Sequence, residues 1–264
     1  MSAIFEGRKS DSPYIDRVWH GCFDQDYMPI CPADARWNLL FLKHEGKMKV
    51  LAEGAVSQSI VKLESKDSEF LVVQFTLGAY MPDFPADMLL NSHVRLKRAN
   101  SRSFWLKGSA WQVPNYENVE TFVDWLVRND HLIYEPIVNN ALKNQTSSLS
   151  ERTIRRRFLY ATGLTPKTIQ QIKRARQAAS LLEQGMPIMD VVFQTGYADQ
   201  SHMTRSLRHY FGQTPTMLAQ LNQAKVCPIC SRPSLFVDIC LGCSNNKQRG
   251  LNHAKNHFSD TRYA

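Results

Sequence analysis

Glycine and proline punctuate residues 149–215 in a regular order, and this pattern constrains the fold more than any other feature of the chain. Ser150 can cap the start of a short helix, because its hydroxyl satisfies a free N–H group of the first turn. Gly163 can end that helix, because glycine readily adopts the left-handed conformation that follows a helix end. Pro166 suits the first turn of the next helix, which Gly185 would close. The pattern predicts a short helix, a tight turn and a long helix.

The same order of residues recurs in the second part of this stretch. Pro187 would open a helix, Gly196 would supply a tight turn, and Asp199 would cap a further short helix that Gly212 would end. A helix, a glycine turn and a second helix with polar residues facing outward are typical of the helix-turn-helix, whose second helix enters the DNA major groove. We predict two such units joined by one long helix. The apolar residues expected to face inward are Ile154, Phe158, Ile169, Ile172, Ala175, Ala179, Leu182, Ile188, Val191, Val192, Leu207 and Phe211.

These units resemble the AraC/XylS type of bacterial transcription regulator. The resemblance rests on S-x-x-x-I-x-R-x-F at 150–158, TGLTP at 162–166, RARQAASLL at 174–182 and PIMDVVFQTGYADQSHMTRSLRHYFGQTP at 187–215. It covers roughly residues 128–224, and the order and spacing of the motifs make it specific. It implies a regulator that binds specific sequences in double-stranded DNA.

The resemblance also implies which residues would meet DNA. The first recognition helix would present Glu151, Arg152, Arg155 and Arg156, and the second Asp199, Gln200, Ser201, His202 and Arg205. Arginine can donate two hydrogen bonds to guanine, and glutamine can pair with adenine. Lys173, Arg174 and Arg208 are expected on phosphates, which position the protein without specifying a sequence. The alternative for any one of these residues is an ordinary solvated helix charge.

The net charge of the chain agrees with a polyanionic partner. Residues 1–120 carry 14 Lys and Arg against 15 Asp and Glu, whereas residues 121–264 carry 18 against 9. A solvated basic surface is the alternative explanation, but Lys and Arg that contact phosphates would produce the same asymmetry. The 43% of apolar residues and 10% of aromatic residues exclude a wholly disordered chain.

The N-terminal part has the alternating short apolar runs of a β domain. Six runs bounded by turn residues read as antiparallel strands, at 37–44, 47–53, 57–64, 69–77, 93–98 and 103–108. Many AraC-type regulators carry an N-terminal β-barrel that senses a signal and dimerises, and this region is similar in kind. We therefore expect an α+β multidomain protein with a cupin-like barrel or sandwich at its N-terminus.

Four regions follow from these patterns. They are a β-rich sensor or dimerisation domain at 1–114, an amphipathic linker helix at 115–128 capped by Asn115, a double helix-turn-helix at 129–224 and a cysteine-rich tail at 225–264. The further partners implied by the resemblance are a small-molecule effector, a second copy of the chain and, for an activator, RNA polymerase.

Catalysis is not expected in the N-terminal domain. A metal-dependent cupin enzyme would need clustered histidines with a carboxylate, whereas His20, His44 and His93 are scattered singly. Such an enzyme remains the less favoured alternative. An effector pocket could be lined by aromatic residues, although aromatic residues of a β domain are more often plain core. The candidates are Trp19, Trp37, Phe75, Trp105 and Trp111.

The tail contains two C-x-x-C pairs, Cys227 with Cys230 and Cys240 with Cys243. Four thiolates in two such knuckles are the ligand set that tetrahedral Zn²⁺ prefers, and the segment resembles a small zinc ribbon. We predict a bound Zn²⁺ with a structural role. A contact with DNA or a partner and a thiol sensor like that of Ada-type regulators remain alternatives. His253 and His257 are expected to be solvated, and Cys22 and Cys31 to be ordinary thiols.

No segment reads as a membrane or secretory element. The longest apolar run, WNLLFL at 37–42, is too short to span a bilayer, and MSAIFEGRKSDS lacks the apolar core of a signal peptide. We expect a cytoplasmic protein, in which disulfides would be disfavoured.

Overall fold

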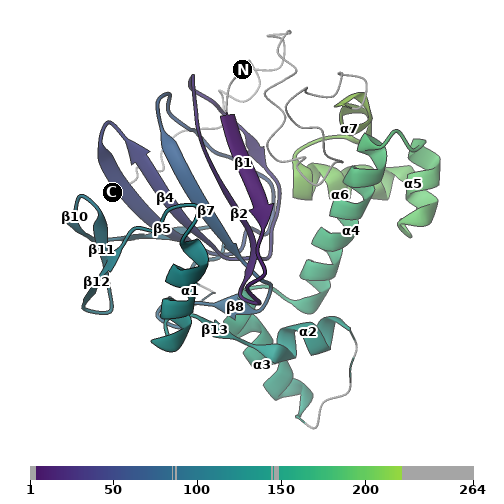
Figure 1. Cartoon of the computed structure of the whole chain (residues 1–264). Coiled ribbons are helices and arrows are strands. Elements are labelled where there is room, and N and C mark those ends of the chain that lie inside the picture. Colours follow the sequence, from purple (N-terminus) through teal and green to yellow (C-terminus); the bar gives the residue numbers. More distant parts are fainter. Residues whose placement is uncertain (1–3, 85, 87, 144, 146–148, 222–264) are drawn as a thin grey trace.

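The structure is a computed structural model and describes residues 4–84, 86, 88–143, 145 and 149–221. The β strands of the N-terminal half form one body, and most of the helices of the C-terminal half lie beside it, with the long helix α4 running along the boundary (Figure 1). A bilayer-crossing helix is absent from the part of the chain that the structure describes.

The main sheet has six antiparallel strands. Their order is β1 (Ile4–Lys9), β2 (Ile15–Cys22), β7 (Glu69–Phe75), β4 (Asn38–His44), β5 (Lys47–Glu53) and β9 (His93–Leu96). Glu45 and Gly46 join β4 to β5 with positive φ angles of 48° and 70°, which is the geometry of a tight hairpin turn. The sheet is open, with β1 and β9 at its edges, so the expected closed barrel is not formed by the described strands.

The core of this half lies between the sheet and helix α1 (Val119–Arg128). Phe122 of α1 packs edge-on against Phe41 of the sheet, with 5.9 Å between ring centroids. The helix begins at Val119, so the prediction that Asn115 caps it is wrong. Asn115 instead accepts a hydrogen bond from the Asn118 backbone N–H at 2.8 Å and forms a turn just before the helix.

Three small sheets complete the strands. They are β3 (Ile30–Cys31) with β6 (Ile60–Val61), β8 (Ala79–Tyr80) with β13 (Ile133–Tyr134), and β10 (Arg98–Asn100) with β11 (Ser103–Leu106) and β12 (Ser109–Gln112). The predicted strand at 57–64 is therefore reduced to two residues. Strand β13 was not predicted, and its pairing with β8 ties the start of the helical region to the β half.

The helices of the second half agree with the predicted caps. They are α2 (Pro136–Leu142), α3 (Glu151–Thr162), α4 (Pro166–Glu183), α5 (Ile188–Gln194), α6 (Gln200–Phe211) and α7 (Pro215–Leu221). The hydroxyl of Ser150 accepts from the Thr153 N–H at 3.3 Å, and the Asp199 carboxylate from the His202 N–H at 2.6 Å. Gly163 and Gly212 end α3 and α6 in the left-handed conformation, each with φ 68°.

Helix α4 is the centre of the helical half. Its apolar stripe is buried as predicted, and α4 contacts α2, α5, α6 and α7. The buried residues of the stripe are Ile169, Ile172, Ala175, Ala178, Ala179 and Leu182. Because helices of both helix-turn-helix units pack against α4, this helix fixes the position of each unit.

Backbone hydrogen bonds join the end of α6 to the β half. The Ala33 N–H donates to the Tyr210 carbonyl at 2.7 Å, and the Ser59 N–H donates to the His209 carbonyl at 2.9 Å. Carbonyls in the last turn of a helix lack partners inside the helix, so these two donors satisfy groups that would otherwise need water. The β half therefore caps the C-terminal end of α6.

Candidate DNA interface

Helix α3 exposes a cluster of positive charge. The side chains of Arg152, Arg155 and Arg156 are all exposed, and none of the three forms an ion pair or side-chain hydrogen bond within the described residues. Phe158 is fully buried on the opposite side of the helix and Ile154 is half-buried. The amphipathic character of α3 thus leaves three guanidinium groups available to a polyanion. Glu151, which was predicted beside them, is exposed in the first turn.

The next arginine has a different role. Arg157 makes a two-point ion pair with Glu135, through Nε to Oε2 at 2.8 Å and Nη2 to Oε1 at 3.0 Å. Glu135 is buried and also caps α2, where its carboxylate accepts from the Ile137 N–H at 3.2 Å. One carboxylate therefore fixes α3 against the start of α2. Glu135 was not among the predicted residues, although it directly precedes Pro136, and proline is favoured as the first residue of a helix.

Helix α6 exposes a polar face of the kind predicted. Gln200, Ser201, Arg205 and Arg208 are exposed, while Met203, Leu207 and Phe211 are buried on the inner side. Asp199 is also exposed, but its carboxylate serves as the cap of α6. The exposed groups include amide, hydroxyl and guanidinium donors, which together can read base edges and phosphates.

Tyr197 fastens the turn between α5 and α6. Its hydroxyl lies 2.8 Å from the Ser206 hydroxyl, and its ring meets the His202 ring edge-on at 5.2 Å between centroids. The guanidinium of Arg174, from α4, lies over the same ring at 4.4 Å from the centroid. Two residues predicted to meet DNA, Arg174 and His202, thus pack on Tyr197 and orient α6. Tyr197 was not among the predicted site residues.

Lys173 lies on the side of α4 that faces the β half. Lys173 is exposed at its surface, but partial desolvation lowers its pKa, and the positive charge of Arg36 lowers that pKa further. Arg36 belongs to the β half, and Arg176, one turn along α4, reaches Asp34 there. The predicted phosphate contact of Lys173 remains a prediction, made from a position close to the boundary between the halves.

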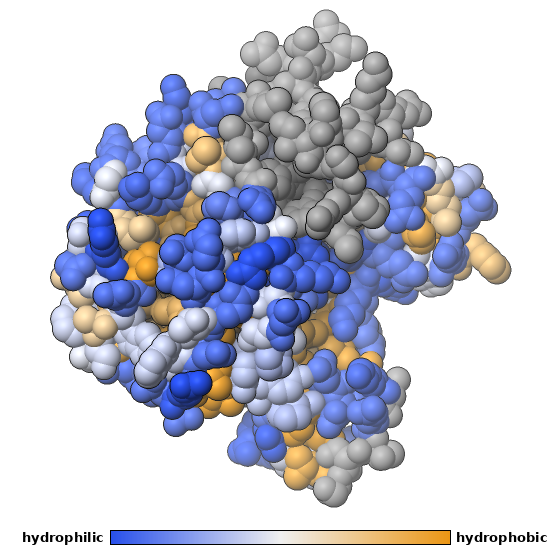
Figure 2. Space-filling view, in the orientation of Figure 1, coloured by the Kyte–Doolittle hydropathy of each residue, from blue (hydrophilic) through white to orange (hydrophobic). Residues whose placement is uncertain are grey.

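The length of α4 suits two helices that act on one DNA face. Its 18 residues span about 27 Å. Recognition helices that enter successive major grooves on one face are about 34 Å apart. Figure 2 shows the two ends of the helical half as separate lobes on the right of the molecule, with a largely hydrophilic concave stretch between them. An arrangement of this kind can follow one side of a double helix.

The charge of this region is strongly one-sided. Between residues 150 and 176 eight residues are basic and one is acidic. Two of the eight, Arg157 and Arg176, pair with carboxylates outside this segment. Half of the remaining six, Arg152, Arg155 and Arg156, are exposed on α3, where contact with phosphates would release condensed counterions.

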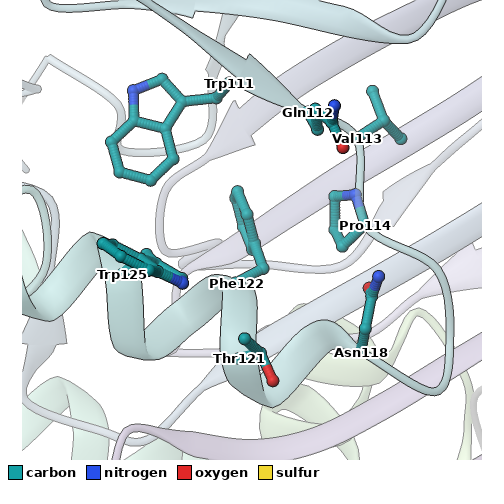
Figure 3. Close-up of a pocket in the computed structure, with 8 residues that line it drawn as sticks. All are labelled: Trp111, Gln112, Val113, Pro114, Asn118, Thr121, Phe122 and Trp125. Atoms are coloured by element: carbon teal, nitrogen blue, oxygen red, sulfur yellow. The ribbon is translucent and has the colours of Figure 1, made fainter.

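An aromatic cavity lies in the N-terminal half, where an effector was expected. It has a volume of about 270 Å³ between the end of β12 and helix α1. Trp111 faces Phe122 and Trp125 across it (Figure 3). Of the five aromatic residues predicted to line an effector pocket, Trp111 alone lines this cavity. Trp37 and Phe75 are core residues, as the alternative explanation held.

The four cysteines predicted to bind Zn²⁺, Cys227, Cys230, Cys240 and Cys243, lie outside the described residues, and so do His253 and His257. Within the described residues no group of three His, Cys, Asp or Glu side chains could hold a metal ion. Cys22 and Cys31 are half-buried, and neither forms a disulfide within the described residues.

Comparison with known proteins agrees with this geometry. Residues 145–220 match a family model described as a helix-turn-helix domain. This part of the chain is therefore similar to helix-turn-helix domains. The matched segment holds α3, α4, α5 and α6, and so contains both candidate recognition helices.

Two individual proteins are also similar. Over 72 residues the chain is 40% identical to YbfI of Bacillus subtilis (strain 168), described as an HTH-type transcriptional regulator, and the match covers 26% of each protein. The chain thus spans about a quarter of the length of the curated relative it matches. The solved structure of ToxT from Vibrio cholerae is 12% identical, with a TM-score of 0.35, over 84% of this chain and 99% of that one. A likeness this weak transfers nothing to this chain.

Proposed function

We propose that the protein is a transcription regulator of the AraC type that binds specific sequences in double-stranded DNA through α3 and α6. The observation that carries the proposal is the pair of exposed polar helix faces on α3 and α6, in two units joined by the 18-residue helix α4 within the segment that matches a helix-turn-helix domain. On α3 we assign base contacts to Arg152 and Arg156, and on α6 to Gln200 and Arg205. Arg208, which is exposed in the last turn of α6, is assigned to phosphate.

Control by the N-terminal half is part of the proposal. The β half contacts α4 through Asp34 and Arg176, and contacts the end of α6 through Ala33 and Ser59. A change in the β half would therefore alter the position of α6. We propose that a signal received there sets DNA affinity, with a second copy of the chain and, for an activator, RNA polymerase as further partners.

Selection of bound sequences from random DNA tests the main proposal. The full chain is expected to enrich one asymmetric motif, because its two recognition helices differ in sequence. Binding of the selected duplex and of a scrambled duplex is then compared for Arg156→Ala and Arg205→Ala. Each is expected to cost about 1–3 kcal/mol on the selected duplex and much less on the scrambled one.

Arg102→Ala is the matched control, because Arg102 is an exposed arginine of the β half. It should leave both affinities unchanged. Absence of enrichment at every salt concentration would contradict the proposal. Equal losses on both duplexes for Arg156→Ala would remove Arg156 from the base-reading residues.

From the spacing of the cysteines alone, we also propose that Cys227, Cys230, Cys240 and Cys243 bind one structural Zn²⁺. Metal analysis of the full chain should give one zinc per chain, and Cys227→Ser with Cys230→Ser should abolish it. Alkylation of the thiols should leave DNA affinity unchanged, whereas a large change would favour a thiol sensor instead.

A further inference from the structure

A second cavity of the β half lies apart from the helix-turn-helix domain. It has a volume of about 250 Å³ and is bounded by β9, β11 and residues 83–84. Leu96 and Leu106 contribute an apolar floor, since both are almost completely buried. Around this floor stand three cations, one carboxylate and one indole, which are Arg95, Lys97, Lys107, Asp83 and Trp105.

The carboxylate of this cavity is already engaged. Asp83 forms an ion pair with Lys107, in which Oδ1 lies 2.7 Å from Nζ. Its other oxygen, Oδ2, lies 3.1 Å from Nδ1 of His131. Arg95 and Lys97 are exposed and have no ion pair among the described residues. The cavity therefore has two positive charges that its own carboxylate does not neutralise, and it favours an anion.

The indole of Trp105 has no ring partner in the described structure. Its side chain lines the cavity, and the residue is 46% exposed. Stacking of a flat ring on an exposed indole removes apolar surface from water and gains ring–ring contact. The cavity thus offers an aromatic surface next to two cations.

The position and size of the cavity limit what it can bind. The β10–β12 sheet, to which Trp105 belongs, lies on the opposite side of the molecule from α5 and α6 (Figure 1), so it is not continuous with the candidate DNA interface. Ligand pockets for drug-sized molecules are typically about 300–1,000 Å³, so 250 Å³ suits a molecule of one or two rings. A dinucleotide would be too large.

We infer that this cavity is a binding site for a small aromatic carboxylate. The ring would stack on Trp105, and Arg95 and Lys97 would donate charge-assisted hydrogen bonds to the carboxylate. The aromatic cavity beside α1 differs in this respect, because no charged side chain lines it.

A residue close to this cavity, Ala86, packs on the end of α3. Ala86, two residues after Phe84 of the cavity wall, places its carbonyl oxygen 2.7 Å from where a Cβ on Gly163 would lie. Because Gly163 ends α3, a movement of this wall would shift the end of α3. Any effect of the ligand on DNA affinity rests on the proposed function, whereas ligand binding itself does not.

Calorimetric titration of the full chain without DNA tests the site. The probe is 2-naphthoate, with 2-naphthamide as the neutral match and cyclohexanecarboxylate as the non-planar anion. Saturable binding of 2-naphthoate is expected, with affinity about tenfold or more above either match. The amide loses the charge-assisted hydrogen bonds of the carboxylate, and the cyclohexane ring loses the stacking on Trp105. Equal affinity for 2-naphthamide, or no saturable binding of 2-naphthoate, would overturn the inference.

Variants then locate the ligand. Arg95→Gln with Lys97→Gln should weaken 2-naphthoate about tenfold. Lys9→Gln with Lys66→Gln removes two exposed charges elsewhere on the β half and should have no effect. Trp105→Leu should remove the preference for 2-naphthoate over cyclohexanecarboxylate. Unchanged binding in the Arg95 and Lys97 variant, with loss in Trp111→Leu, would place the ligand in the cavity beside α1 and overturn the inference.

The titration distinguishes this inference from the proposed function. A chain that binds 2-naphthoate but enriches no DNA sequence would contradict the proposed function alone. A chain that enriches a sequence but does not bind 2-naphthoate would contradict the inference alone.

Discussion

Arg176, in α4, donates a hydrogen bond to the Asp34 carboxylate of the β half at 3.2 Å, and so joins the two halves of the chain. Asp34 also accepts from the Arg36 guanidinium at 3.1 Å and from the Gln74 amide at 3.2 Å. Burial alone would raise the pKa of Asp34, but the charges of Arg36 and Arg176 outweigh it and hold that pKa below its ordinary value. The carboxylate is therefore ionised at neutral pH and binds one arginine from each half.

Replacement of this carboxylate should loosen the attachment of α4. Asp34→Asn is expected to lower the free energy of unfolding by about 2–4 kcal/mol, because it removes the negative charge that Arg36 and Arg176 share. Arg176→Gln should cost less, about 1 kcal/mol, since that side chain is 38% exposed. Denaturant unfolding of both single variants and the double variant measures the coupling. Strictly additive losses would contradict an interaction between Asp34 and Arg176.

Glu135 and Arg157 provide a second test, at helix α3. Glu135→Gln is expected to cost about 2–3 kcal/mol of unfolding free energy, because the side chain is 9% exposed and its partner would keep an unmatched charge. Arg157→Lys keeps the charge but loses the two-point geometry, and should fall between the wild type and Glu135→Gln. A stability of Arg157→Lys as low as that of Glu135→Gln would show that the geometry, more than the charge, accounts for the contact.

Two glycines with the same φ angle allow the cost of backbone strain to be measured apart from the cost of a steric clash. Gly163 and Gly196 both have φ 68°, but a Cβ on Gly163 would lie 2.7 Å from the Ala86 carbonyl oxygen, whereas a Cβ on Gly196 would meet nothing within 4 Å. Gly196→Ala should cost about 1–2 kcal/mol for the left-handed conformation. Gly163→Ala should cost about 1–3 kcal/mol more, because a backbone carbonyl cannot turn aside. Equal thermal unfolding of the two variants would mean that Ala86 does not pack on the end of α3.

Acid should weaken the attachment of α1 to the edge strand β1. Hydrogen bonds from Arg8 lower the pKa of Glu120 to about 2, against an effect of burial that raises it. The pKa in the folded state is below that of the unfolded chain, so the stabilisation is complete above pH of about 4.5 and is lost as pH falls toward about 2. Solvent screening reduces its size to about 1–2 kcal/mol.

The comparison of wild type with Glu120→Gln measures this effect. The difference in unfolding free energy between the two proteins should shrink as the pH is lowered from 6 to 3. A difference that stays constant over that range would contradict the ion pair between Arg8 and Glu120.

The salt dependence of DNA binding should show whether Arg208 and Lys173 each contact a phosphate. Arg208→Ala is expected to reduce the slope of log affinity against log salt by about 1, as the loss of one phosphate contact does. Lys173→Ala should reduce it equally if Lys173 also meets a phosphate. An unchanged slope for Lys173→Ala, with a change in stability, would assign Lys173 to the boundary with the β half.

The ends of the helices were predictable because capping is local chemistry. Ser150, Asp199, Gly163 and Gly212 act on groups only a few residues away, so their sequence positions were sufficient. At Asn115 the same reasoning chose the wrong residue. Asn115 and Asn118 hydrogen-bond to each other, and both have side chains suited to a helix start.

Pairings between distant residues were not predictable in this way. Strand β13 is only two residues long and exists because β8, far earlier in the chain, supplies its partner. The openness of the main sheet likewise depends on which strands become edges, and short apolar runs do not specify that. Of the candidate interface, the exposed faces of α3 and α6 followed from helical periodicity. The contacts of Arg157, Arg174 and Lys173 depended on neighbours that only the fold brings near.

The β half grips the last turn of α6 by main-chain atoms, the amides of Ala33 and Ser59 bonding the carbonyls of Tyr210 and His209. Main-chain groups are the same whatever side chain a residue carries. Substitutions at these four positions can therefore accumulate among relatives without paired, compensating changes. Covariation between aligned sequences would understate this contact, and amide hydrogen exchange at Ala33 and Ser59 would report its opening directly.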